Sequence, residues 1–403
     1  MGIIRILILI SISHFSTVGA QQSDKQLRMV QVLFRHGARA PTEKITDPSY
    51  HSQFPRGLGE MTDAGFENSY LMGRFLKKRY VDTGFLNPIM NPREMYWRSV
   101  NKNRCLSTAS TVGFAMFDDE IHHLHVPVQT EEYDEHLLNY NQDRCEREIE
   151  LVKERCPNFN GTFHPWVKYE AFIANCLNYT HPVFDIYPFE NIEAYINEYK
   201  NSIPPPKLIQ QHLDEVMAIY VNVTHFITGT GNHHDPRMMR VKFGYLMTTL
   251  QKEITWMKED LEKLARGEPL QYSMRKKFNV YSTQDWILMG VLDSLGVLKN
   301  TVGLEVYPEY NSMIILELWE ETGRFFVKTF YKKEEITHEN HQLLDVSHLV
   351  RNCTDTECPF ENFISCCEDY KAGSRRGCVS QKRKPRSLWT NEDENVPQFA
   401  GPE

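Results

Sequence analysis

The sequence lacks an apolar segment of the roughly 20 residues that a membrane-spanning helix needs. The apolar run Ile6–Ile10 near the N-terminus is much shorter, Arg5 precedes it, and the small residues Val18-Gly19-Ala20 follow it. This order of a basic residue, an apolar stretch and small residues is typical of a secretory signal peptide. We therefore expect residues 1–20 to be cleaved and the mature chain to have no membrane segment, with a signal anchor as the alternative.

The chain also lacks an excess of positive charge, because 45 Lys and Arg face 53 Asp and Glu, a formal net charge of -8 with the 16 histidines neutral. Nucleic acid is therefore not an expected partner. No internal repeat or low-complexity array is present. With 41% hydrophobic and 24% charged residues, the 403-residue chain has ordinary globular composition and can bury a core as one large or two modest domains.

The cysteines do not show the spacing of a zinc ribbon, although four of them crowd between Cys353 and Cys367. In the secretory route they are candidates for disulfides instead. The total of nine is odd, so at least one lacks a partner within the chain. The polar tail 381–403 is expected to be disordered.

Four asparagines stand in glycosylation sequons that suit the same compartment. They are Asn160, Asn178, Asn222 and Asn352. Asn352 is the weakest candidate, since the next residue is the disulfide candidate Cys353.

Three parts of the chain share one order, in which a short apolar or β-branched run leads into polar residues and then into a segment of helical period. The runs are 27–34, 94–97 and 278–282. They lead into Arg35-His36-Gly37, Arg98-Ser99 and Gln284-Asp285. Alternating strands and helices favour an α/β sheet, in which ligands bind beyond the carboxyl ends of the strands. The polar clusters are therefore expected to meet at one edge.

Between the second and third runs, approximately residues 119–270, the pattern changes to helices and polar loops. Apolar residues from Phe243 to Leu264 recur in steps of four and three, which predicts a long amphipathic helix. A coiled-coil dimer uses the same spacing, but a helix packed on its own domain is favoured at this length. We expect an inserted helical cap. Further on, the runs 312–319 and 324–331 flank Glu320-Glu321-Thr322-Gly323 and predict a β-hairpin.

The heptapeptide Arg35-His36-Gly37-Ala38-Arg39-Ala40-Pro41 places one imidazole between two guanidinium groups directly after a strand. Guanidinium forks match pairs of phosphate oxygens. A histidine beside permanent cations resists protonation and stays available as a nucleophile or a base. The plainer alternative is that His36 only ends a strand while the arginines pair with acids in solvent.

Asp285 is suited to donate a proton, since ester cleavage needs an acid for a poor leaving group and a carboxylic acid serves at acidic pH. Its alternative role is to cap a helix. No metal or other cofactor is expected. The paired histidines at 122–125 and 233–234 have no carboxylate at a ligand spacing and are interpreted as surface or pocket-lining residues.

The heptapeptide resembles the Arg-His-Gly-x-Arg-x-Pro signature of the histidine acid phosphatases, and the likeness runs over most of the mature chain. Residues 54–62 and 74–80 resemble the lysosomal and prostatic branch, and Tyr96-Trp97-Arg98-Ser99 resembles its second phosphate-binding arginine motif. The resemblance implies an α/β fold over 21–380, with a phosphoglycerate mutase-like central mixed sheet flanked by helices and a mostly helical cap. Dimers are common in this branch, so a homodimer is a possible assembly.

By the same resemblance, Arg35, Arg39 and Arg98 hold the phosphate oxygens, His36 attacks phosphorus, and Asp285 protonates the leaving alkoxide. Water then hydrolyses the phosphohistidine. Two disulfide placements also follow from the resemblance. Cys353 and Cys358 look like a short local disulfide, Cys156 looks placed to pair with Cys378, and the other pairs stay open.

The chain departs from the family where Gln284 replaces the usual histidine and Asn101 replaces an aspartate. Gln284 still offers a neutral hydrogen bond to phosphate, so the loss is about 1 kcal/mol, or on the order of tenfold in rate. The leading hypothesis is an acid phosphatase of the extracellular fluid or lysosome that hydrolyses small phosphate monoesters. The alternatives are a weakened or inactive phosphate-binding protein and, disfavoured by the signal peptide and cysteines, a phosphomutase.

Overall fold

The computed structural model describes residues 25–42, 44–118, 124–131, 137–138, 145–156, 166–270, 275–333 and 343–373. Several predicted features lie outside the described residues. They are the signal peptide 1–20, the sequon at Asn160, Cys378 and the tail 381–403.

The described residues form one eight-stranded sheet in the order β3-β2-β4-β1-β5-β6-β7, with β8 paired to β6. The strands are β1 (Lys25–Arg35), β2 (Met95–Ser99), β3 (Val128–Gln129), β4 (Phe278–Thr283), β5 (Met313–Glu321), β6 (Arg324–Lys332), β7 (Leu344–Asp345) and β8 (Cys358–Pro359). The pairs β1–β4, β2–β4 and β2–β3 are parallel, whereas β5 joins β1 antiparallel. The expected mixed α/β sheet is confirmed.

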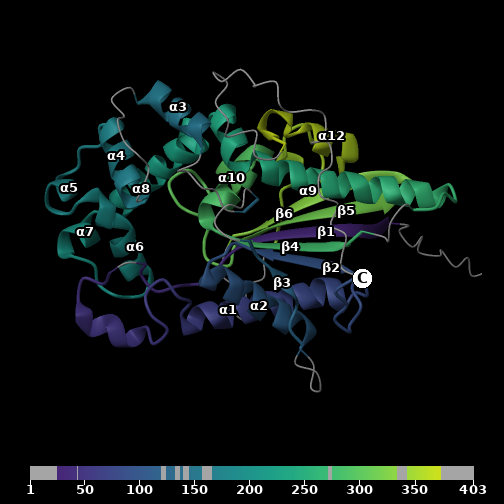
Figure 1. Ribbon diagram of the computed structural model, residues 1–403, viewed down its shortest axis with the longest axis horizontal. Helices are drawn as coiled ribbons and strands as arrows, with labels where there is room; N and C mark the ends of the chain where they lie inside the picture. The colour runs from purple at the N-terminus through teal and green to yellow at the C-terminus, as the bar shows by residue number, and fades with distance from the viewer. Residues whose placement is uncertain are drawn as a thin grey trace, which may run out of the picture.

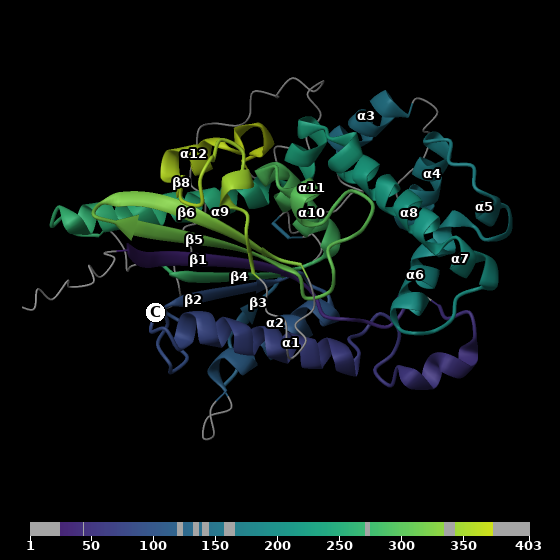
Figure 2. The ribbon, with the colours of Figure 1, turned by 180° about the vertical axis from the view of Figure 1, so that it is seen from behind.

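The central strand β1 is apolar on both faces because helices cover both sides of the sheet. Val32 and Phe34 pack with α1 (Asp63–Leu76) and α2 (Asn103–Phe117). On the other face, Leu33 packs with α9 (Pro236–Ala265) and α10 (Asp285–Leu295). Figure 1 shows these layers, and Figure 2 shows them from behind.

The shorter helices of the middle segment group at one end of the molecule (Figure 1). They are α3 (Glu146–Arg155), α4 (Trp166–Cys176), α5 (Pro182–Ile186), α6 (Ile192–Lys200), α7 (Lys207–Gln211) and α8 (Leu213–Thr228). Their apolar side chains form a core separate from those of the sheet. The long helix α9 packs its apolar stripe, including Phe243 and Ile254, against the sheet instead. The segment expected to form one cap therefore contributes to two cores, one formed by the short helices and one formed by α9 with the sheet.

Local signals place several boundaries as expected. The Thr62 hydroxyl accepts a hydrogen bond from the Gly65 amide (3.2 Å) and caps α1. Gly296 ends α10 in the left-handed region with φ 85°. The hairpin β5–β6 turns at Thr322 and Gly323, both of positive φ, as a two-residue turn between twisted strands requires. Two further short helices are α11 (Leu298–Thr301), which follows α10, and α12 (Phe360–Ser365), which follows β8.

The disulfides confirm one expected pair and correct another. Cys353 pairs with Cys358, as expected, but Cys156 pairs with Cys176, so its expected pairing with Cys378 is wrong. Cys156 directly follows α3 and Cys176 ends α4, and both helices pack in one core, which brings the two Cα atoms to 6.0 Å. The sequence could not show which helices are neighbours.

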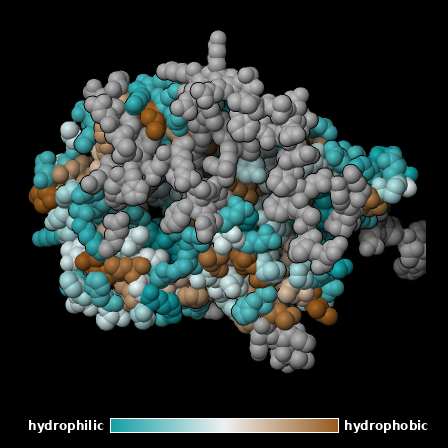
Figure 3. All heavy atoms as spheres, in the orientation of Figure 1, coloured by the Kyte–Doolittle hydropathy of each residue, from teal (hydrophilic) through white to brown (hydrophobic). Residues whose placement is uncertain are grey.

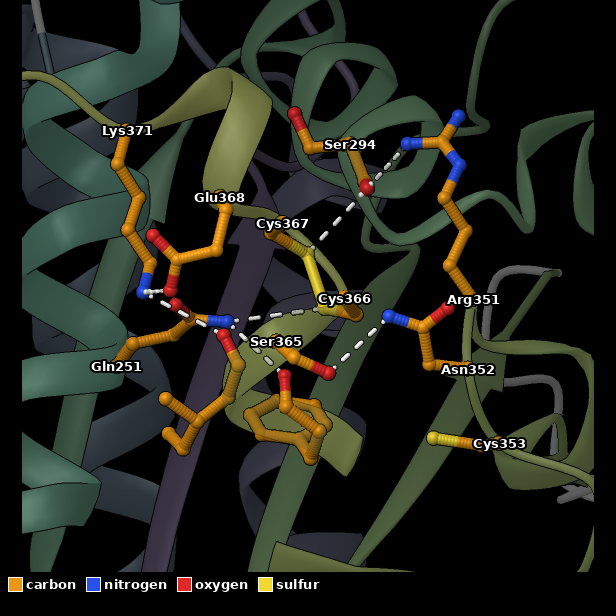
Figure 4. Close-up of a disulfide and its surroundings, with 12 residues drawn as sticks. Gln251, Ser294, Arg351, Asn352, Cys353, Ser365, Cys366, Cys367, Glu368 and Lys371 are labelled. Carbon is orange, nitrogen blue, oxygen red and sulfur yellow. Dashed lines mark hydrogen bonds and ion pairs between the residues drawn. A yellow bond between two sulfur atoms is a disulfide. The ribbon is translucent and has the colours of Figure 1, made fainter. Parts of the chain in front are cut away.

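A third disulfide joins the adjacent residues Cys366 and Cys367 (Figure 4). The Gln251 amide of α9 lies 3.6 Å from the Cys366 sulfur, and the Cys367 sulfur lies 3.3 Å from the Ser294 carbonyl of α10. The pair therefore contacts both helices. Cys145 is disulfide-bonded as well, and the described residues contain one free thiol, the buried Cys105.

The described sequons differ in accessibility. Asn178 is exposed at the turn after α4, and Asn352 is exposed before Cys353. Asn222 lies inside α8, where its amide donates to the Tyr179 hydroxyl, an arrangement that disfavours a glycan. Glycosylation stays a prediction, best placed at Asn178.

None of the helices in the described ranges has the length and apolar character needed to span a bilayer. The face seen in Figure 3 is mostly hydrophilic where it is coloured, with small separate hydrophobic patches.

Candidate active site

The carboxyl ends of the parallel strands β1, β2 and β4 lie side by side and bring the three polar clusters together. The His36 amide donates to the Thr283 carbonyl (3.0 Å), and the Val100 amide donates to the Ser282 carbonyl (3.0 Å). These bonds extend the ladder past the last residues of β1 and β2. The expectation that the clusters meet at one edge is confirmed.

His36 is buried, with 2% of its surface exposed. Its Nδ1 lies 2.9 Å from the Gly37 carbonyl oxygen, which can only accept, so Nδ1 carries the proton. The other ring nitrogen, Nε2, then holds the lone pair. The Arg104 Nε–H donates to that lone pair at 3.2 Å.

The environment of His36 keeps the ring neutral. Burial lowers the pKa of His36 well below its ordinary value, and the cations Arg104, Arg35 and Arg39 lower it further. This direction confirms the expectation from the heptapeptide. A neutral imidazole with a defined lone pair is a competent nucleophile under acidic conditions.

The three expected phosphate-binding arginines each have a carboxylate partner. Arg35 pairs with Asp285 (2.7 Å), Arg39 with Glu193 of α6 (2.6 Å) and Arg98 with Glu131 (2.7 Å). Their side chains are only 4–5% exposed, whereas Glu193 and Glu131 are 34% and 55% exposed. An incoming anion can replace the exposed acids while the guanidinium groups stay in place.

Neutral contacts fix the orientation of these arginines. Arg35 donates to the Pro308 carbonyl (2.6 Å) and lies 4.2 Å from the centre of the Tyr310 ring. Arg39 donates to the Thr42 hydroxyl (2.5 Å), and Arg98 donates to that of Tyr96 (3.2 Å). A planar guanidinium held in this way is preorganised for phosphate.

Asp285 is the first residue of α10. Burial would raise its pKa, but the charge of Arg35 and the hydrogen bond from the Trp286 amide (2.8 Å) outweigh burial, so the pKa of Asp285 lies below its ordinary value. The N-cap position itself belongs to Gln284, so the alternative that Asp285 is the N-cap is wrong. The side-chain oxygen Oε1 of Gln284 accepts a hydrogen bond from the Trp286 indole N–H (3.3 Å).

Sequence reasoning missed Arg104, Glu193 and Tyr310. Arg104 lies in the first turn of α2, the helix that follows Arg98, so a second cation at the same strand-to-helix junction was a usable signal. Glu193 and Tyr310 approach from other segments, and nothing local in the sequence marks them.

One group among the described residues could hold a metal ion, namely His181, His212 and Glu215. The Val183 amide donates to His181 Nδ1 (3.2 Å), so Nε2 carries the proton and donates to Glu215 (2.8 Å). This hydrogen bonding accounts for the cluster without an ion. His234 similarly contacts Asp293 and the Tyr370 hydroxyl.

Comparison with known proteins identifies the family. The profile of the histidine phosphatase superfamily (branch 2) matches residues 26–203. "Putative acid phosphatase 1" of Caenorhabditis briggsae is 31% identical over 374 residues, covering 89% of this chain and 84% of the relative. The chain belongs to the histidine phosphatase superfamily, branch 2.

Two further similarities agree with this membership. Human "Prostatic acid phosphatase" is 28% identical over 355 residues, covering 84% of each chain. The crystal structure of Klebsiella sp. ASR1 phytase has a TM-score of 0.56 at 14% identity and covers 91% of this histidine phosphatase and 99% of the phytase. The resemblance read from the sequence and the α/β fold are both confirmed.

Proposed function

We propose that this histidine phosphatase is an acid phosphatase that hydrolyses phosphate monoesters through a phosphohistidine on His36. The observation that carries the proposal is the buried, neutral His36, whose Nε2 lone pair lies among arginines. The names of the relatives, which include acid phosphatase, support the same reaction.

In the first step, Nε2 of His36 attacks phosphorus while Arg35, Arg39 and Arg98 hold the phosphoryl oxygens. The N–P bond forms as the ester P–O bond breaks, and Asp285 transfers its proton to the leaving alkoxide. In the second step, water attacks phosphorus, the N–P bond breaks, and the Asp285 carboxylate takes the proton from water. Inorganic phosphate leaves, and His36 and Asp285 return to their starting states.

The protonation of Asp285 depends on the substrate. In this structure its carboxylate pairs with Arg35, which favours the ionised form. A bound phosphate group offsets the charge of Arg35, so Asp285 then takes up a proton more readily. Acidic solution favours that form, while the low pKa of His36 keeps the nucleophile unprotonated.

Gln284 is the observation that favours a second candidate, a phosphate-binding protein of reduced or no activity. Its neutral amide replaces a cation usual in the family, which weakens phosphate binding without removing the nucleophile or the acid.

The proposed location and substrates complete the proposal. The disulfides suit the secretory route, which leads to the extracellular fluid or the lysosome. The proposed substrates are small phosphate monoesters. The cap boundary at approximately 119–270, possible dimerisation and the absence of a cofactor remain parts of this proposal.

The test is hydrolysis of p-nitrophenyl phosphate by the purified secreted protein from pH 4 to 8, beside His36→Ala, Asp285→Asn and Gln284→His. We expect acid-range turnover that is lost in His36→Ala, with alkaline quench and mass spectrometry locating a phosphoryl group on His36 of the active protein. Asp285→Asn should slow alkyl phosphates more than p-nitrophenyl phosphate, whose leaving group needs less protonation. Turnover that appears only in Gln284→His would establish the binding protein instead.

A further inference from the structure

We propose that Glu193 of α6 selects the substrate by charge. Once the substrate phosphate has replaced its carboxylate on Arg39, Glu193 faces the leaving group and favours phosphate monoesters of short amino alcohols over phosphates that carry a further negative charge. The inference rests on the proposed function and names its substrate class.

The ion pair between Glu193 and Arg39 occupies the edge of the guanidinium that a phosphate would bind. Arg39 Nη2 donates to Glu193 Oε1 (2.6 Å), while Nη1 donates to the Ala40 carbonyl (3.1 Å) and the Thr42 hydroxyl (2.5 Å). The Arg39 Nε–H, on the same edge as Nη2, is buried and has no hydrogen-bond acceptor in the described part of the chain. A phosphate group can therefore take both N–H groups of this edge, and it displaces Glu193 when it does so.

Hydrogen bonds hold the backbone of α6 in place whatever the Glu193 carboxylate contacts. The Asn197 amide donates to the Glu193 carbonyl (2.8 Å), and its oxygen accepts from the Tyr310 hydroxyl (3.2 Å). Asn201, further along the helix, donates to the Arg39 carbonyl (3.0 Å). Displacement by phosphate therefore turns the Glu193 side chain away from the guanidinium but leaves the residue at the edge of the site.

Two other cations could compensate the displaced carboxylate, but both are engaged. Lys200, further along α6, pairs with Glu309 (3.1 Å). Arg104 donates to His36 Nε2, at the position that the phosphoryl group takes in the proposed reaction. A cation supplied by the substrate is therefore the partner that fits the displaced Glu193.

The surroundings of Tyr307 indicate that Glu193 lies on the side of the leaving group. Burial raises the pKa of Tyr307 well above its ordinary value, and the charges of three acids raise this pKa further. They are Glu170, Asp285 and Glu193. Asp285, the proposed proton donor to the leaving group, thus acts on the same phenol as Glu193.

The same region offers aromatic rings beside the carboxylates. The Tyr307 and Tyr220 rings lie 5.9 Å apart, and the Tyr220 hydroxyl donates to the Glu170 carboxylate (3.1 Å). Carboxylates and aromatic faces attract an ammonium group and offer no partner to a second anion. A leaving group that carries an ammonium group therefore suits this side of the site.

The plainer alternative is that Glu193 only occupies Arg39 until a substrate arrives. In that case its removal would change the reaction of every monoester by the same factor. Selection by charge instead requires that the effect depends on the charge of the leaving group.

The experiment measures inorganic phosphate release at pH 6 by the purified secreted protein and by Glu193→Gln, which removes the charge and keeps the size. Aminoethyl phosphate carries an ammonium group, propyl phosphate is its neutral isostere, and carboxymethyl phosphate carries a carboxylate. In Glu193→Gln we expect the kcat/KM ratio of aminoethyl to propyl phosphate to fall by about 3- to 10-fold, between the effects of an exposed ion pair and a partly buried one. The ratio of carboxymethyl to propyl phosphate should rise by a similar factor.

These ratios separate selection from folding and from intrinsic reactivity. The active fraction of a variant cancels within each ratio, and the different reactivities of the esters cancel between variants. Glu193→Asp keeps the charge and should keep the order of preference. The control Glu190→Gln removes an exposed acid shortly before α6 and should leave both ratios unchanged.

The inference and the proposed function can fail separately. Equal changes for all three esters in Glu193→Gln would overturn the inference, while wild-type turnover and its loss in His36→Ala still supported the phosphatase. If the wild-type protein has no turnover, calorimetry measures Kd for the same esters. An unchanged ratio of the aminoethyl and propyl phosphate Kd values in Glu193→Gln would then overturn the inference.

Discussion

At the scale of single residues, the candidate site separates the proposed nucleophile from the proposed acid by environment. His36 is buried among cations and stays neutral, whereas Asp285 lies against Arg35 and a helix N-terminus and favours the ionised form. Two groups whose pKa values move down for different reasons can therefore serve opposite roles. Under the proposed mechanism, a substrate phosphate group would partly cancel the charge of Arg35 and so favour protonation of Asp285.

Gln284→His should raise activity. Restoring an imidazole that is cationic at acid pH replaces a neutral hydrogen bond to phosphate by a charged one, so we expect kcat/KM at pH 5 to rise by up to about tenfold. Steady-state hydrolysis of p-nitrophenyl phosphate measures this change. Gln284→Asn is the control, since it keeps a neutral amide, and an equal gain in that variant would refute the charge argument.

At the scale of elements, the strand-to-helix junction after β1 depends on two glycines that face each other. A Cβ on Gly65 would lie 2.1 Å from the Ala38 carbonyl oxygen, and one on Gly37 would lie 2.6 Å from the Gly65 carbonyl oxygen. The first turn of α1 thus packs directly on the backbone of the loop after His36. This close approach holds the loop in the position that the heptapeptide needs.

Gly65→Ala should destabilise the protein, although alanine is intrinsically the better helix former by about 1 kcal/mol. The added methyl group would collide with the Ala38 carbonyl oxygen, which belongs to the backbone and cannot rotate aside as a side chain can. Overpacking of this kind lowers the free energy of unfolding by about 1–3 kcal/mol. We expect a lower Tm and a reduced kcat/KM. Gly373→Ala is the matched control, since its Cβ would meet no atom within 4 Å. A stabilised Gly65→Ala would show that the loop is not held by this contact.

At the scale of the whole molecule, the buried histidine His225 links α8 to the loop that precedes β5. His225 Nε2 donates to the Leu304 carbonyl (3.2 Å), and Nδ1 accepts from the Thr230 hydroxyl (2.7 Å). Burial lowers the pKa of His225 to about 4. The neutral ring therefore links the helical segment to the loop before β5, and its protonation opposes the folded state.

Acidification should weaken this attachment. Because the folded pKa lies below the unfolded value near ~6.5, the unfolded chain binds the proton first, and stability falls as pH drops from about 6.5 to 4. The loss at pH 4 is on the order of 3 kcal/mol from this group. Urea unfolding at pH 7 and pH 4.5 measures it, and His225→Gln should show a smaller difference between the two. The exposed His51→Gln is the control, and a wild-type stability independent of pH would refute the prediction.

The sequence by itself determined the parts that depend on neighbouring residues. The strand at 27–34, the hairpin around Gly323 and the amphipathic helix from Phe243 follow from periodicity and turn chemistry, whereas the pairing of Cys353 with Cys358 was implied by the family resemblance. The heptapeptide around His36 likewise predicted a neutral imidazole beside guanidinium groups, because its charges act over a few residues. The meeting of His36, Arg98 and Asp285 followed from the rule for carboxyl ends of parallel strands.

Only the tertiary structure decided which distant segments meet. It placed Glu193 against Arg39, joined Cys156 to Cys176 rather than Cys378, packed α9 on the sheet, and brought Arg104 to the lone pair of His36. Arg104 had a local signal, since it stands at the strand-to-helix junction that follows Arg98, whereas the other contacts result from the packing of helices whose neighbours depend on the whole fold. The family was therefore readable from short stretches of sequence, and so was the prediction of His36 as nucleophile, while most of the side chains that contact the site residues were not.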